Sequence, residues 1–147
     1  MSLSDWARNE WLVEHKTSPQ EIKGLLGVAD RDMRDCAAKG LSDDWRLAIA
    51  YNAALQCATA ALAASGYRAS RESHHFRILQ SLSLTIGLDN KLVGQLDAFR
   101  KKRNVSDYER AGMVSEAEAD EIVCIARALR KQVEEWLRRN HPALVPN

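Results

Sequence analysis

The segment 47–64 places the strongest constraint on the fold of this chain. It is dominated by alanine, and it stops just before Gly66. A helix that is small and apolar on nearly every side has no face suited to water, so it belongs at the centre of a helical bundle. Polar residues interrupt the segment too often for a membrane span. They are Tyr51, Asn52, Gln56 and Thr59.

Start and stop signals predict further helices on either side of this central one, which should cover residues 45–64. Ser18 and Pro19 provide an N-cap and a first helical position, with Glu21 three residues after the cap. Ser115 and Glu118 form a second capping box. Apolar residues recur at helical spacing after each start. The other predicted helices cover residues 4–15, 19–40, 74–86, 89–103 and 115–139.

The composition fits a single globular domain. A chain of 147 residues with 46% hydrophobic and 28% charged residues can bury one ordinary core. Its formal net charge of +1 gives no global attraction to nucleic acid or anionic lipid, so such affinity must come from local clusters. We predict an all-α, up-and-down bundle of about four core helices over residues 1–147, with a peripheral N-terminal helix in 1–17 and a tail at 143–147.

The cysteines and the N-terminus favour a cytoplasmic protein. Cys36, Cys57 and Cys124 are far apart and lack the Cys-x-x-Cys spacing of a zinc or redox site, so we interpret them as buried free thiols. The first residues contain neither a basic region nor an apolar run, and nothing there predicts export. We predict no cofactor and no metal site, because adjacent histidines such as His74 and His75 cannot share one face of a helix.

Four consecutive cations, Arg100, Lys101, Lys102 and Arg103, end the helix predicted at 89–103. After them the chain is expected to turn, since Asn, Ser and Asp follow. One interpretation is a solvated helix end, because cations complement the negative end of the helix dipole. The other is a phosphate-binding edge, which would also include Arg110.

Several catalytic motifs do not occur in the sequence, which limits the available chemistry. It has no Gly-rich phosphate loop, no His-Glu-x-x-His and no Gly-x-Ser-x-Gly. Arg, His, Tyr and Asp remain, a set that suits phosphodiester cleavage without a metal. For Asn52, the alternatives are a core hydrogen bond and a position facing a functional cleft. His74 and His75 are either capping and packing residues or groups that face a central cleft.

The chain resembles the HEPN superfamily of prokaryotic helical bundles over most of its length, residues 45–136. The resemblance rests on the Ala-rich helix around Tyr51, the Gly66-Tyr67 exit, the His74-His75 start and the Arg103-Asn104-x-x-Asp107-Tyr108 turn. It implies a homodimer that brings two copies of the Arg-containing turn together in a cleft. Many members are metal-independent endoribonucleases of toxin–antitoxin and defence systems, often encoded beside a minimal nucleotidyltransferase.

The resemblance also implies site residues. Arg103 and Asn104 match the first half of the family's motif, but Asp107 and Tyr108 stand where a histidine is expected. If the chain cleaves RNA, Arg103 is expected to stabilise the phosphate and Asn104 to orient either Arg103 or the phosphate. Asp107, Tyr108 or His75 would then transfer the proton. These residues leave open whether the chain is an enzyme.

Besides catalysis, three interpretations follow from the same residues. In the first, the dimer cleft binds a nucleotide, an RNA segment or a partner nucleotidyltransferase without turnover, and residues 100–103 supply charge only. In the second, Asp107 pairs with Arg103 or Arg100, Tyr108 packs over the bundle end, and the turn fixes a dimer interface. In the third, a nucleotidyltransferase antitoxin modifies Tyr108. No membrane partner is expected.

Overall fold

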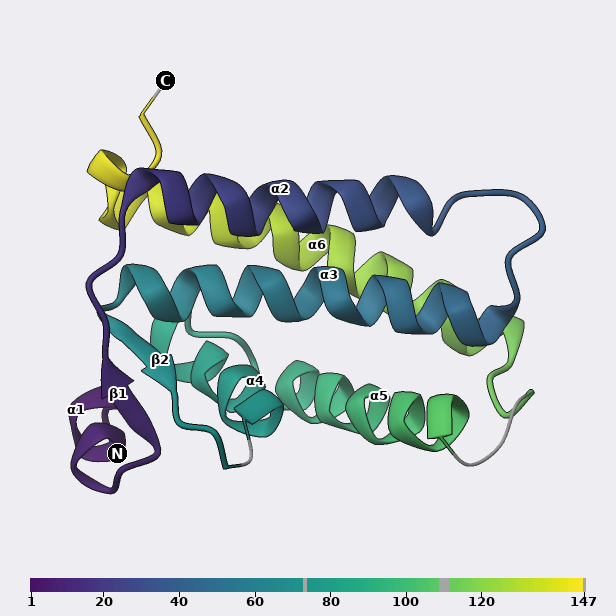
Figure 1. The fold of residues 1–147 in the computed structure, drawn as a ribbon, viewed down its shortest axis with the longest axis horizontal. Helices are drawn as coiled ribbons and strands as arrows, with labels where there is room; N and C mark the ends of the chain where they lie inside the picture. Colours follow the sequence, from purple (N-terminus) through teal and green to yellow (C-terminus); the bar gives the residue numbers. More distant parts are fainter. Residues whose placement is uncertain (73, 109–111, 147) are drawn as a thin grey trace.

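Helix α3 (Asp43–Ala64) runs through the middle of the bundle, as its composition predicts (Figure 1). The structure, a computed structural model, describes residues 1–72, 74–108 and 112–146, with the side chains of residues 105–108 outside this description. The alanines of α3 from Ala48 to Ala63 are buried. Among the described residues α3 alone is long and apolar enough to cross a membrane, but 72% of its apolar window is buried inside the protein, which is typical of a core helix.

The other long helices occupy three sides of α3. Helix α2 (Pro19–Asp35) lies along one side, while α4 (His74–Thr85) and α5 (Asn90–Tyr108) follow one another along the opposite side (Figure 1). Helix α6 (Glu116–Asn140) lies behind α2 and α3 in this view and packs against both of them (Figure 1). The predicted all-α bundle is confirmed, since the described chain is 72% helical.

Serine caps start three of these helices, two of them, at Ser18 and Ser115, at the predicted places. The side chains of Ser18, Ser42 and Ser115 accept hydrogen bonds from backbone N–H groups three residues ahead. Glu118 completes the second predicted capping box by accepting from the backbone N–H of Ser115 at 3.0 Å. The first is not completed, because the carboxylate of Glu21 binds His15 and Thr17 instead. Each such cap satisfies a donor that the first helical turn leaves without an intrahelical partner, and it typically stabilises by about 1 kcal/mol.

The prediction of one helix over residues 4–15 is wrong. The segment forms a short helix α1 (Leu3–Arg8), then a strand β1 (Leu12–Glu14) that pairs antiparallel with β2 (Tyr67–Ala69). Leu12 lies opposite Ala69, and both are buried. A helix this short is marginal alone, whereas pairing with β2 satisfies backbone groups and buries Leu12 on the bundle.

Two predicted helix ends are also wrong. Helix α2 ends at Asp35 rather than at Gly40, because the backbone N–H groups of Ala37 and Ala38 bond three residues back and tighten the last turn. Helix α5 does not turn after Arg103 but continues to Tyr108. Asn, Val, Ser and Asp each cost only a fraction of a kcal/mol in a helix, so none of them stops it.

Smaller corrections concern a cysteine and the C-terminus. Cys36 and Cys57 are buried as predicted, but Cys124 is exposed, because it lies beside the packing stripe of α6. The C-terminal residues are more than a tail. They include a 3₁₀ turn, η1 (Pro142–Leu144), and Leu144 and Val145 pack against the core.

Candidate functional site

An open cavity of about 380 Å³ lies where the start of α4 faces the second half of α5. His75 and Arg100, two residues singled out from the sequence, line it together with Asn104. His74 and Phe76 complete the lining. Positions 100 and 104 are one helical turn apart, so α5 presents both to the same side. The fold therefore brings two imidazoles, a guanidinium and a side-chain amide into one cavity.

Tyr51, on the central helix, contacts both His75 in this cavity and Arg103. Its side chain is fully buried in α3, and its hydroxyl oxygen lies 3.4 Å from Nδ1 of His75. The guanidinium carbon of Arg103 is 5.5 Å from the centroid of the Tyr51 ring. One buried tyrosine thus contacts both His75 and Arg103, which are far apart in the sequence.

The surroundings of His75 favour its neutral form. Burial lowers the pKa of His75 below its ordinary value, and the neighbouring His74, Arg103 and Arg100 lower it further. Burial raises the pKa of Tyr51 to about 12, against the opposing effect of Arg103 and Arg100. At pH 7 the site therefore combines a neutral imidazole, a protonated phenol and two permanent cations.

The predicted basic edge is divided among different partners. Arg100 donates to Asp97 at 2.7 Å, and Nζ of Lys101 lies 3.6 Å from the same carboxylate. Lys102 points elsewhere, with its Nζ 3.4 Å from the carboxylate of Glu118 on α6. Successive helical residues point about 100° apart, so four consecutive cations cannot form one patch. Arg100 and Arg103 are the members that lie close to His75.

Some predicted residues fall outside the part that the structure describes. Helix α5 includes the backbone of Asp107 and Tyr108, but their side chains are not described, and neither is Arg110. Sequence reasoning missed Phe76 and Asp97 as members of the site. The signal for Tyr51 was present, since it is one of few polar residues in an otherwise apolar helix.

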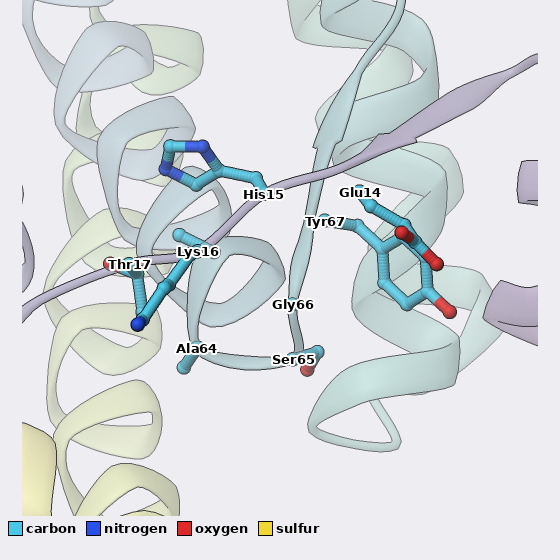
Figure 2. A pocket seen from close by; sticks show the side chains of 9 residues that line it. Glu14, His15, Lys16, Thr17, Ala64, Ser65, Gly66 and Tyr67 are labelled. Atoms are coloured by element: carbon cyan, nitrogen blue, oxygen red, sulfur yellow. The ribbon is translucent and has the colours of Figure 1, made fainter.

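A second hollow, of about 640 Å³, lies where the chain enters α2 beside the end of α3 (Figure 2). His15 is at its edge, with Nε2 2.7 Å from a carboxylate oxygen of Glu21, which also accepts from the hydroxyl of Thr17. Figure 2 shows Glu14 and Tyr67 side by side across the hollow from His15, as their strand pairing requires. None of the predicted site residues lies here.

The described part of the chain contains no candidate metal site. Within the described ranges, no three His, Cys, Asp or Glu side chains come together in a way that could hold a metal ion. The cavity at His75 offers acid–base groups and fixed positive charge, which suit an anionic substrate that loses or gains a proton. Comparisons of the chain with protein-family models and with curated protein sequences find no match.

Proposed function

We propose that this chain is a HEPN-like, RNA-directed protein that cleaves single-stranded RNA without a metal ion. The observation that carries the proposal is the half-buried His75 in an open cavity, with a lowered pKa and with Arg100 and Arg103 close by. A neutral imidazole is the most common general base in proteins at neutral pH. Permanent cations beside it can stabilise the charge that builds on a phosphate in the transition state.

The proposed step begins at the ribose 2′-hydroxyl. His75 accepts its proton, the 2′-oxygen forms a bond to phosphorus, and the bond from phosphorus to the 5′-oxygen breaks. That oxygen takes a proton from water, and the hydroxide left behind takes the proton from His75, so the products are a 2′,3′-cyclic phosphate and a 5′-hydroxyl end. Arg103 stabilises the pentavalent phosphate, Arg100 adds positive charge, and Asn104 binds a phosphate oxygen.

Tyr51 is the positioning residue of this mechanism. A neutral imidazole carries one proton, and only its other nitrogen can act as a base. When Nδ1 carries that proton and donates it to the oxygen of Tyr51, Nε2 keeps its lone pair for the 2′-hydroxyl. We propose that the tyrosine oxygen accepts this hydrogen bond, which is the role of the acidic residue in a catalytic triad, although a hydroxyl, unlike a carboxylate, can also donate to Nδ1.

The wider setting belongs to the same proposal and rests on the family resemblance. The chain acts as a cytoplasmic homodimer in a toxin–antitoxin or defence module, beside a minimal nucleotidyltransferase that modifies Tyr108. Sedimentation of the purified chain measures the dimer. The intact mass of the chain after incubation with such a partner and a nucleoside triphosphate measures the modification.

Cleavage of labelled single-stranded and hairpin RNA in EDTA tests the catalytic proposal. We expect products with 2′,3′-cyclic phosphate ends, and a loss of about a hundredfold or more in His75→Ala and Arg103→Ala. His141→Ala, which removes an imidazole packed on Trp136, serves as the matched control and should retain activity. Equal cleavage by wild type and both site variants would refute the mechanism.

A non-catalytic binding module is the second candidate function. It is favoured by Asp97, which partly compensates the charge of Arg100 and Lys101, and by the absence of the family's motif histidine. In this case the cavity holds an RNA phosphate without turnover. RNA that binds to the wild-type chain but stays intact, with weaker binding to Arg103→Ala, would favour this second candidate.

A further inference from the structure

A stack of aromatic rings and cations leads away from the proposed cleavage cavity toward the N-terminal segment. The guanidinium carbon of Arg77 lies 3.7 Å from the ring centroid of Trp11 and 5.3 Å from that of Phe76. On the cavity side, Arg100 lies 5.6 Å from the centroid of Phe76. We call Trp11, Arg77 and Phe76 the Arg77 stack. It is continuous with the cavity because Phe76 belongs to both.

The N-terminal segment holds the stack in place. Trp6 is buried and meets Trp11 edge to face, with ring centroids 5.8 Å apart. The backbone N–H of Trp11 donates to the carbonyl of Trp6 at 3.0 Å, and its carbonyl accepts from the N–H of Ser70. Trp11 is therefore fixed by the fold and does not have to be ordered when a ligand binds.

The side chains of the stack are of the types that bind single-stranded RNA. Trp11 and Phe76 are only half-buried, so part of each ring remains in contact with solvent. Aromatic rings and guanidinium planes are the surfaces on which unpaired bases stack. Within the described ranges no carboxylate pairs with Arg77, so its charge is not compensated there, unlike that of Arg100, which Asp97 partly neutralises.

We propose that the Arg77 stack binds a nucleotide next to the one that is cleaved. The base packs on the exposed parts of Trp11 and Phe76, and Arg77 contacts the adjoining phosphate. This inference rests on the proposed RNA-directed function and extends it, because it places a nucleotide-binding subsite beside the cleavage cavity and gives the N-terminal segment a part in binding. Paired bases are excluded, since their faces are already stacked in the duplex.

The test uses two fluorescein-labelled oligonucleotides of 2′-O-methyl ribose, which lack the nucleophilic hydroxyl and so cannot be cleaved. One is a heptamer of uridine, and the other has the same backbone and phosphates with abasic positions. Fluorescence anisotropy measures binding to the full chain. Circular dichroism of each variant reports whether the bundle and its N-terminal segment remain folded.

Each variant removes a different contact. Trp11→Leu keeps an apolar side chain but no ring, so we expect it to weaken uridine binding between about fivefold and a hundredfold and to leave abasic binding unchanged. Arg77→Gln keeps both rings and should weaken both oligonucleotides, with the salt dependence reduced by about one phosphate contact. Trp136→Leu, the same substitution on α6, should bind both as wild type does.

The outcomes separate this inference from the function on which it rests. If wild type binds both oligonucleotides equally, or if Trp11→Leu and Arg77→Gln bind like wild type, the stack has no role in recognition, whatever the cleavage assay shows. If wild type binds the uridine heptamer more tightly, loses this preference in Trp11→Leu and yet leaves RNA intact, the stack binds RNA but the chain is not a nuclease. If wild type binds neither oligonucleotide, both proposals fall.

Discussion

The hydroxyl oxygen of Tyr51 lies 3.4 Å from Nδ1 of His75, although the tyrosine belongs to the central helix α3 and the histidine to the first turn of α4. Tyr51 is fully buried and His75 is half-buried, so the contact joins the core to the cavity. A buried hydroxyl needs a hydrogen-bond partner, because an unpaired one costs about 1–3 kcal/mol. The site is therefore built into the packing of the bundle.

Replacing Tyr51 by Phe should change the tautomer of His75 while the bundle stays folded. The ring that fills the core remains, and only the hydroxyl is lost. Without its partner, Nδ1 loses a hydrogen bond worth about 0.5–1.5 kcal/mol, which corresponds to at most about tenfold in the tautomer ratio. Long-range ¹H–¹⁵N spectra of the imidazole should show a smaller share of the Nδ1–H form than in wild type. An unchanged ratio would contradict the positioning role of Tyr51.

The stability of the chain should fall in mild acid because of His75. Its pKa in the folded chain lies below its ordinary value of about 6.5, so the unfolded chain binds a proton more readily. The contribution to stability is complete above about pH 7 and decreases as the pH falls through about 6.5 toward the folded pKa. In His75→Gln this loss is absent. Urea unfolding at pH 7.5 and pH 5.5 measures it, and an equally large acid loss in the variant would contradict the expectation.

The sequence could predict the fold because its decisive signals are local. A helix without a polar face has to be central, and serine followed three residues later by glutamate, just before apolar residues at helical spacing, marks a start, as at Ser115. Strand β1 could not be predicted in this way. Leu12 is in a strand only because Ala69 lies opposite, a pairing between distant segments that three residues of sequence do not encode.

The site was predictable only in part, for the same reason. Arg103 and His75 could be named as candidates from their residue types and from the family resemblance. Their common contact with Tyr51 depends on how α3, α4 and α5 pack, which no spacing in the sequence reveals. The run of four cations suggested a single basic edge, which the structure does not form. Adjacent side chains on α5 point in different directions, and Lys102 lies beside Glu118.

Asn52 has a structural role in this fold, and its removal should destabilise the chain. Its Nδ2 donates at 2.6 Å to the buried carboxylate of Asp32 on α2, which answers the question left open by the sequence in favour of a core hydrogen bond. Asn52→Ala removes a donor from a buried acceptor, so we expect a loss of about 1–3 kcal/mol in the free energy of unfolding. Gln56→Ala, which removes only a 3.3 Å bond to Asn52, is the control and should cost at most about 1 kcal/mol. Equal losses in the two variants would refute this role.

The close packing around α3 should make it intolerant of larger side chains. Ala58 is fully buried where neighbouring helices surround α3, so Ala58→Leu forces the helices apart or its own side chain out of a favoured rotamer. Such overpacking typically costs about 1–3 kcal/mol. Alanine and leucine are both strong helix formers, so propensity contributes little to the difference. Ala128→Leu makes the same change on an exposed position of α6 and should leave the unfolding midpoint in urea nearly unchanged. If the two variants unfold at the same urea concentration, α3 is not packed as tightly as its alanines indicate.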